Sequence, residues 1–276
     1  MGYKLSPATK VTLIAAAVAA LLVAGGPLAA TASTPTPAAT TPTPTKVGAP
    51  GFHLSSKGGL QYTKLSFQQK IQVDPNPYGV FYSNQFGDAE GHSGGYIGIQ
   101  TQNSTYPGMR PILWSVWGGT AVSCPTNGAD HLTCYTTGNM EDGSAGAATR
   151  VFVPWQAGDL ITLSIIQVPN KPGWWKAQYW SSRTGAISLG QIQFGNADAN
   201  DTISPAGSFV EYPWSNGQIC SAGPASDALF FPILGNLHGV PQPAQPWTSI
   251  TSSDCNYRDT AASISPDGYA NAPVAP

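Results

Sequence analysis

The chain has 276 residues, of which 9% are charged, and its formal net charge is −2. An ordinary soluble domain has about 25% charged residues, so small polar and aromatic side chains must supply most of this protein's surface. The charge balance leaves no basic patch that could neutralise a phosphate backbone, and we therefore expect no nucleic-acid partner.

Residues 1–32 have the pattern of a signal peptide. Lys4 and Lys10 give a positive start, residues 11–24 are almost wholly apolar, and the small residues at 30–32 form a cleavage site. We predict cleavage after Ala32, because the apolar run is shorter than the roughly 20 residues that cross a bilayer. An uncleaved anchor is the alternative. After cleavage we expect no membrane span, and we predict a monomer that is secreted or associated with the cell envelope.

Residues 33–58 are predicted to be a linker. Their central run, T-P-T-P-A-A-T-T-P-T-P-T, favours extended polyproline II and cannot pack into a domain. Such a spacer would hold the next domain away from a cell surface. At the other end, residues 263–276 are small and polar, and we predict a disordered tail. The folded domain is therefore expected to span residues 59–262.

Between these ends, strand patterns alternate with turn residues and no helical period is found. About ten strands in roughly 200 residues are too many for one open sheet. We therefore predict an all-β fold, a concanavalin-like jelly roll of two antiparallel sheets packed face to face. The expected strands cover residues 64–73, 80–86, 96–102, 112–117, 149–153, 160–168, 174–181, 187–194, 208–212 and 228–234.

The stretch from 94 to 117 shows the strand alternation most clearly. In residues 112–117, one face carries Ile, Trp and Val, and the other carries Leu, Ser and Trp, as a pleated, half-buried strand requires. Gly98 interrupts the preceding strand pattern. A glycine at such a position leaves a spot where another backbone or a ligand can approach.

The chain has four cysteines, and export would carry them into an oxidising compartment. Of the three possible pairings, Cys124–Cys134 with Cys220–Cys255 is the most economical, and we predict these two disulfides. No C-x-x-C pair occurs and no histidine lies at ligand spacing, so we predict no metal site and no cofactor. The acidic loops at 88–90 and 141–143 leave calcium open, although neither has a known coordination spacing.

Residues 174–180, W-W-K-A-Q-Y-W, give the strongest indication of a binding surface. A strand here places Trp174, Lys176, Gln178 and Trp180 on one face. Flat aromatic rings beside amides suit a sugar, which has an apolar face and a polar rim. Together with Tyr96, these four residues are the predicted ligand-binding set. The alternative is that the rings pack in the core or beneath a loop.

Two further features bear on catalysis. Residues 91–95 match the G-x-S-x-G nucleophile elbow, but no helix pattern follows, and a glycine-rich turn is the better interpretation. Glu211 lies inside a strand pattern amid aromatic residues. Partial desolvation would raise the pKa of this carboxyl group and suit it to acid or base catalysis; a solvent-facing or structural carboxylate is the alternative. A glycosidase would need a second acid about 5–9.5 Å away, which Glu90 or Glu141 could supply.

Several motifs occur in a characteristic order: G-Y-I-G-I-Q at 95–100, I-L-W-S-V-W at 112–117, V-P-W at 153–155, G-D at 158–159, W-W at 174–175 and S-F-V-E at 208–211. In this order they resemble a family of secreted β-sandwich proteins of unknown function. The resemblance covers about residues 78–214. It implies a secreted jelly roll and no particular activity.

Y-I-G-I at 96–99, G-D-L-I at 158–161 and F-V-E at 209–211 are also similar to strands of the secreted glutamic peptidases, which are jelly rolls too. This resemblance implies that Glu211 activates water, and that a glutamine holds it and steadies the oxyanion. The segment similar to their I-L-Q-T-G carries Trp114 at the glutamine position. The partner here would therefore be Gln100 or Gln102.

The leading hypothesis from the sequence is a secreted protein that binds an extracellular glycan or cell-wall polymer. The rival hypothesis is a peptidase-like or glycosidase-like hydrolase, with Glu211 as general base, Gln100 as its partner and activity shifted to acidic pH. A purely structural surface protein is the third. The hydrolase hypothesis requires Gln100 and Glu211 to emerge on the same face of a sheet.

Overall fold

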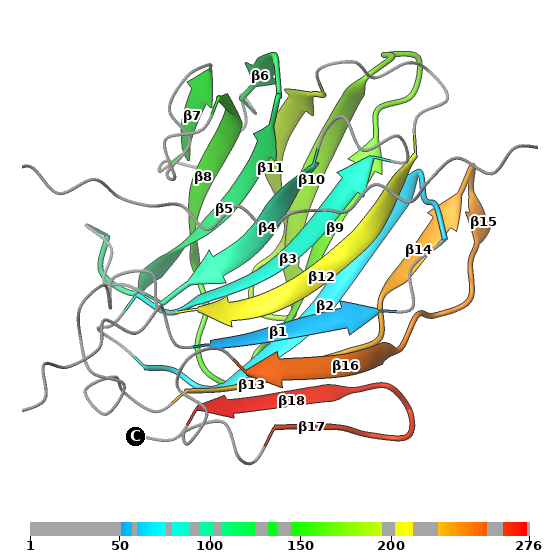
Figure 1. Ribbon diagram of the computed structural model, residues 1–276. Helices are drawn as coiled ribbons and strands as arrows, with labels where there is room; N and C mark the ends of the chain where they lie inside the picture. The colour runs from blue at the N-terminus through cyan, green and yellow to red at the C-terminus, as the bar shows by residue number, and fades with distance from the viewer. Residues whose placement is uncertain are drawn as a thin grey trace, which may run out of the picture. The chain divides into compact units, whose positions relative to one another are not determined.

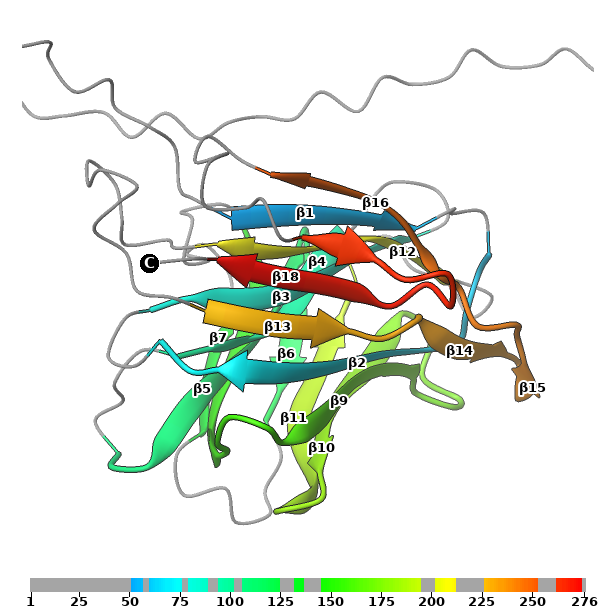
Figure 2. The same ribbon diagram turned by 90° about the horizontal axis from the view of Figure 1, so that it is seen from below.

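The computed structural model describes residues 51–56, 60–75, 79–88, 94–101, 106–124, 132–136, 145–194, 202–211, 226–252 and 262–274. The strands in these ranges form two antiparallel sheets, A and B, which lie face to face (Figure 1; Figure 2). None of the described residues is helical, so no helix among them is long and apolar enough to cross a membrane. The predicted all-β sandwich is confirmed.

Sheet A has the strand order β16-β1-β12-β3-β4-β5-β8-β7, and it lies in front in Figure 1. In that order its strands span Trp247–Ser252, Gly51–Ser56, Ile203–Glu211, Phe81–Asp88, Gly94–Gln100, Met109–Trp117, Gly146–Pro154 and Leu132–Thr136. Because β12 lies between β1 and β3, the segment that ends at Glu211 comes to lie beside two segments from the first part of the chain.

Sheet B has the order β17-β18-β13-β2-β9-β10-β11-β6, with β14 paired to β2 and β15 paired to β14. In that order the strands span Ser263–Ile264, Ala270–Val274, Ser226–Phe230, Lys64–Val73, Leu160–Gln167, Trp174–Ser181, Gly185–Gln193 and Ala121–Ser123, followed by Leu234–Leu237 (β14) and Val240–Pro241 (β15). Every strand predicted from the sequence is found, and β2 and β10 have the predicted bounds.

The folded domain begins earlier and ends later than predicted. β1, within the predicted linker, pairs with both β12 and β16. β17 and β18, within the predicted tail, pair with each other, and β18 also pairs with β13. The reason is non-local: Leu54 in β1 is 2% exposed, and Ala270 and Ala272 in β18 are fully buried, by strands that are distant in the sequence.

The hydrophobic core lies between the two sheets. From sheet A it receives Trp114, and from sheet B Trp175 and Tyr179, all with 0% exposure. Phe194 stacks on both Phe86 and Trp175, with ring centroids 5.9 and 5.5 Å apart. Burial of these rings supplies much of the hydrophobic stabilisation of the sandwich.

Cys124 and Cys134 form the predicted disulfide, with 6.2 Å between their Cα atoms. Cys124 directly follows β6 in sheet B, and Cys134 lies in β7 of sheet A, so the bridge joins the two sheets. A disulfide is compatible with an extracellular protein, and secretion itself stays a prediction. Cys220, Cys255 and the predicted signal peptide lie outside the described residues.

A polar network crosses the otherwise apolar interior. The Asn84 Nδ2 atom donates to Gln69 Oε1 over 3.0 Å, and Ser208 Oγ donates to Asn84 Oδ1 over 2.7 Å. Gln69 belongs to sheet B, whereas Asn84 and Ser208 belong to sheet A. All three side chains are at most 2% exposed, so water cannot replace a lost partner.

We expect Asn84→Ala to lower the free energy of unfolding by about 2–3 kcal/mol, because it leaves Gln69 and Ser208 buried without their partner. Urea unfolding of both proteins measures the difference. Gln68→Ala is the matched control: its amide donates to Thr162 over 3.4 Å at a partly exposed position, and its cost should stay near 0.5 kcal/mol. Equal effects of the two substitutions would show that the network does not stabilise the interior.

Candidate functional site

Glu211 and Gln100 lie on the same face of sheet A, each directly opposite Phe81. The β12–β3 register pairs Glu211 with Phe81, and the β3–β4 register pairs Phe81 with Gln100. Directly opposed residues project to the same side of a sheet. That side is the outer face of sheet A, because the alternate residues Tyr82 and Val210 belong to the core between the sheets.

One strand, β3, separates Glu211 from Gln100. Two strand-to-strand steps separate Glu211 from Gln100, which corresponds to roughly 10 Å between their backbones. Both side chains are long enough to reach toward each other past Phe81, which lies between them in the two registers. The sequence requirement that both residues share a face is met.

Burial changes the acidity of Glu211. The loss of solvation raises the pKa of its carboxyl group from 4.5 to about 7, and no other cause contributes. A carboxylate of this kind holds a proton much more strongly than an exposed one, and its ionised form is a correspondingly stronger base. Glu211 therefore changes charge near neutral pH.

The Gln100 side chain has an unused hydrogen-bonding atom. Gln100 is 2% exposed, and its Oε1 atom is buried without a hydrogen-bond partner. The same is true of the hydroxyl oxygen of Ser83, which follows Phe81 on the outer face and is 0% exposed. An unmet buried polar atom costs about 1–3 kcal/mol. Two unpaired polar atoms on the same face as a carboxyl group with a raised pKa are typical of a site that is completed by water or a ligand.

A small apolar cluster lies next to this pair on the outer face. Phe81, Tyr96, Leu113 and Phe209 are each at most 8% exposed, and Trp117 packs against them. The Phe81 ring lies 5.6 Å from the Tyr96 ring and 5.8 Å from the Phe209 ring, in edge-to-face contacts. We call these five residues the outer aromatic cluster.

The Phe81 ring contacts residues that precede Glu211 and Gln100 on their strands. Its Cε2 atom would lie 2.7 Å from a Cβ atom added at Gly98. The open spot that the sequence predicts at Gly98 is therefore filled by the protein's own ring. The ring therefore packs against Gly98 and the two neighbouring rings, beside the two polar side chains.

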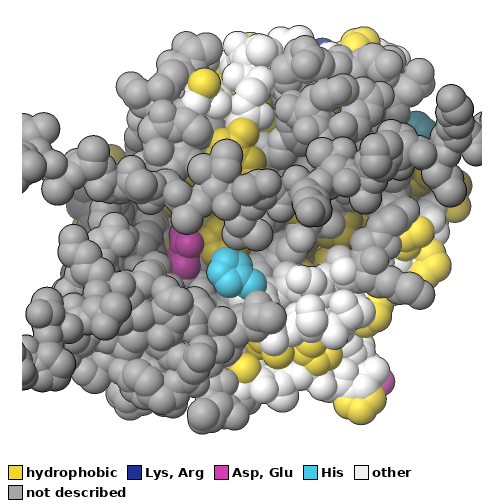
Figure 3. Space-filling model, viewed as in Figure 1, with side chains coloured by type: hydrophobic (Ala, Val, Ile, Leu, Met, Phe, Trp, Pro, Cys, Tyr) yellow, Lys and Arg dark blue, Asp and Glu magenta, His cyan; other side chains and the backbone are white. Residues whose placement is uncertain are grey.

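His53 is a third polar side chain on this face. In the β1–β12 register, Gly51 lies opposite Glu211 and His53 lies opposite Phe209, so the imidazole is diagonal to the carboxyl group. The His53 and Phe209 rings are 6.1 Å apart, and burial lowers the pKa of His53 below its ordinary value. Figure 3 shows this face, with an acidic side chain next to a histidine and hydrophobic side chains beside them.

The predicted ligand-binding set is divided between the two outer faces. Trp174, Lys176, Gln178 and Trp180 point outward from sheet B, because Trp175, Ala177 and Tyr179 on the alternate positions are fully buried. Tyr96 belongs to the outer aromatic cluster of sheet A. One ligand-binding surface therefore cannot include Tyr96 together with the β10 residues.

Other candidates from the sequence cannot be placed. Gln102, Glu90, Glu141 and the glycine-rich turn at 91–93 lie outside the described residues. Within the described part of the chain, no group of three or more His, Cys, Asp or Glu side chains could hold a metal ion.

Four residues of this face were not predicted as site residues from the sequence: His53, Phe81, Ser83 and Phe209. A signal for Phe81 was available: in F-Y-S-N-Q-F at 81–86 both alternating faces carry an aromatic residue, so one ring had to face away from the core. His53 lies in a six-residue strand directly after a proline-rich run, and no local pattern could link it to position 211.

No protein-family model matches the chain, and no curated protein matches its sequence. The resemblance to the secreted β-sandwich family of unknown function therefore stays a prediction.

Solved structures of glutamic peptidases are among the structures to which the chain is similar. The chain is 11% identical to scytalido-glutamic peptidase with a peptide-based transition-state analogue, with a TM-score of 0.41, covering 82% of this chain and 97% of that one. The same peptidase with a transition-state analogue inhibitor gives 11% identity, a TM-score of 0.42 and coverages of 83% and 98%. SCP-B, an eqolisin-family peptidase in complex with the tripeptide Ala-Ile-His, is 11% identical to the chain, with a TM-score of 0.31, covering 83% of this chain and 98% of that one. These are the peptidases that the strand motifs resemble, but likeness at this level says nothing of this chain's chemistry, which must come from its own side chains.

Proposed function

We propose that the chain is a hydrolase of peptide bonds that uses Glu211 as general base and Gln100 as its partner. One observation carries the proposal: both residues lie opposite Phe81 on one face, and there the carboxyl pKa is raised to about 7 and the amide oxygen has no partner. A perturbed carboxyl group beside an unmet amide is what water activation requires.

In the proposed reaction, the Glu211 carboxylate takes a proton from a water molecule held against the Gln100 amide. The water oxygen attacks the carbonyl carbon of the scissile bond, and the Gln100 Nε2–H donates to the oxygen that becomes negative. The protonated Glu211 then passes its proton to the leaving nitrogen as the C–N bond breaks. The outer aromatic cluster offers an adjacent surface for an apolar side chain of the substrate.

A peptidase-like reaction suits the site better than a glycosidase-like one. Glycoside hydrolysis commonly needs two carboxyl groups on either side of the scissile bond. On the described strands of sheet A, the outer face carries Glu211 as its one carboxylate. Acyl transfer to water instead needs one base and one oxyanion donor, and Glu211 with Gln100 supplies that combination.

The raised pKa changes the pH range expected from the sequence. A general base must be ionised, and Glu211 with a pKa of about 7 is largely protonated in acid. We therefore expect kcat/KM to rise with pH and to level off above about 7, in place of the acid-shifted activity that the sequence analysis predicts.

Cleavage of a peptide library, followed by mass spectrometry between pH 4 and 9, tests the proposal. We expect Gln100→Ala to lower kcat by roughly 10²–10³-fold, the usual cost of losing an oxyanion donor. Gln85→Ala is the matched control, since Gln85 lies on the same face opposite Tyr96 and should leave kcat unchanged. Absence of cleavage by the wild type, or full activity of Gln100→Ala, would refute the proposed mechanism.

A further inference from the structure

The outer face of sheet B, on the other side of the sandwich from Glu211, carries three of the four described lysines, whereas Arg110 and Arg150 lie on sheet A. The described residues include four lysines, Lys64, Lys70, Lys171 and Lys176. Lys64, Lys70 and Lys176 project from this face, since the alternate residues on β2 and β10 are buried. The net charge of −2 gives no indication of this arrangement. The lysines are far apart in the sequence and come together only in the folded sheet.

Two of these lysines form a pair across one strand. Lys64 on β2 and Lys176 on β10 both lie opposite Ile166 on β9, which separates them by roughly 10 Å. Both are partly exposed, and neither forms an ion pair with any described acidic side chain. On the described strands of this face the one carboxylate is Asp227, on β13, beyond β2. Among the described residues, therefore, no acidic side chain neutralises the two lysines in the middle of the face.

Hydroxyl and amide groups continue the surface between these charges. The Oγ atoms of Ser66 and Ser164 are hydrogen-bonded over 2.8 Å, and Gln178 lies next in the same row, opposite Ser164. The two serines are 7% and 8% exposed and bond each other, so the partly exposed amide of Gln178 is the group of this row that can meet a ligand. Such a flat polar surface fits a sugar chain better than it fits an apolar partner.

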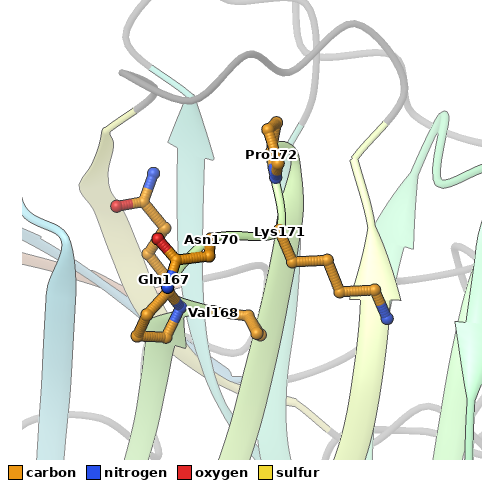
Figure 4. A pocket seen from close by; sticks show the side chains of 6 residues that line it. Gln167, Val168, Asn170, Lys171 and Pro172 are labelled. Carbon is orange, nitrogen blue, oxygen red and sulfur yellow. The ribbon is translucent and has the colours of Figure 1, made fainter.

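Trp180 provides an exposed ring at one end of the row. It lies opposite Thr162 on the same face and is 43% exposed. Trp174 is different, because the Lys171 ammonium lies 3.3 Å from the centre of its ring and also donates to Gln191 Oε1 over 3.2 Å. Figure 4 shows the Lys171 side chain extending from the β9–β10 turn, away from Gln167 and Asn170. Of the two predicted ring platforms, Trp180 is therefore the open one.

We propose that the outer face of sheet B binds an acidic polysaccharide. A sugar ring packs on Trp180, its hydroxyl groups meet Gln178, and carboxylate groups of the polymer pair with Lys64 and Lys176. The charge on this face selects an acidic polymer over a neutral one. The rings and amides favour sugar over a bare polyanion. This inference is independent of the proposed hydrolase activity, because binding requires no turnover.

Affinity electrophoresis of the full chain in gels containing polygalacturonate tests the inference, with methyl-esterified polygalacturonate and polyphosphate as comparison polymers. We expect binding to polygalacturonate that weakens with added salt. The double substitution Lys64→Gln with Lys176→Gln should weaken it roughly ten-fold, and Trp180→Ala by a similar factor. Arg110→Gln removes one positive charge away from this face, where Arg110 pairs with Asp74 over 3.6 Å, and it should change nothing.

Three outcomes would overturn the inference. The first is absence of binding to polygalacturonate, and the second is binding that the lysine and tryptophan substitutions leave intact. The third is equal binding to one of the comparison polymers. Equal binding to the esterified polymer would show that charge has no role, and equal binding to polyphosphate would show that the sugar has none.

Discussion

Glu211→Gln is expected to lower hydrolysis by roughly 10²–10⁴-fold, the usual contribution of a general base, and at the same time to stabilise the protein at neutral pH. Both effects have one cause. Burial raises the pKa of the Glu211 carboxyl group to about 7. The ionised carboxylate is therefore unfavourable in the folded protein, and this drives it to take a proton from water. Glutamine keeps the shape and removes the charge.

The sign of the stability effect follows from proton linkage. Below about pH 4.5 the carboxyl group is protonated in the folded and the unfolded chain, so ionisation contributes nothing. As the pH rises, the unfolded chain releases its proton first, and the folded state loses stability until Glu211 ionises near pH 7. At about 1.36 kcal/mol for each unit of pKa, the total loss is about 3 kcal/mol.

Urea unfolding at pH 4 and pH 8 checks this expectation. The variant and the wild type should be nearly equal in stability at pH 4, and the variant should be more stable by about 3 kcal/mol at pH 8. Asp227→Asn is the matched control, because burial also raises the pKa of Asp227, which lies in β13 of sheet B, and it should leave hydrolysis unchanged. A variant that is less stable than the wild type at pH 8 would mean that Glu211 makes favourable contacts as a charged group.

Gly98→Ala is expected to cost about 3 kcal/mol or more of folding free energy and to disable the site as well. A Cβ atom at this position would lie 2.5 Å from the Tyr82 carbonyl oxygen, 2.7 Å from Phe81 Cε2 and 2.8 Å from Ser83 Cα. Two of these atoms are backbone, so the β3–β4 pairing must widen and the Phe81 ring must move. Overpacking of this kind typically costs 1–3 kcal/mol, and more where the backbone cannot give.

Gly94→Ala is the matched control, on the same strand and the same face. There the nearest atom to an added Cβ is the Phe86 carbonyl oxygen at 3.1 Å, followed by Trp117 side-chain carbon at 3.5 Å, which requires a much smaller adjustment. Denaturant unfolding and kcat of both variants should separate them clearly. If Gly98→Ala unfolds at the same urea concentration as Gly94→Ala, the Phe81 ring is not held against Gly98.

Local features of the sequence predict much of this fold. The alternation at 112–117 correctly puts Trp114 and Leu113 on opposite faces, because a strand's period of two does not depend on its neighbours. The same rule correctly separates Trp175 from Trp174. β1 was missed, since its burial comes from pairing with β12 and β16, and no six-residue pattern shows that.

The candidate site depends on strand order, which local patterns do not encode. Glu211 and Gln100 share a face because β3 lies between β12 and β4 and pairs Phe81 with both; a shift of one residue in either register would place them on opposite faces. For the same reason the sequence could not show that Tyr96 and Trp180 belong to different sheets, or that the lysines gather on one of them.

The most direct test of Glu211 as the general base is the titration of its carboxyl group, by ¹³C NMR of protein labelled at the glutamate side chains, with Glu211→Gln to assign the signal. We expect a midpoint near pH 7. A midpoint near pH 4.5 in the wild type would contradict it, because an ordinary carboxylate in that place could not be the desolvated base on which the proposed function rests.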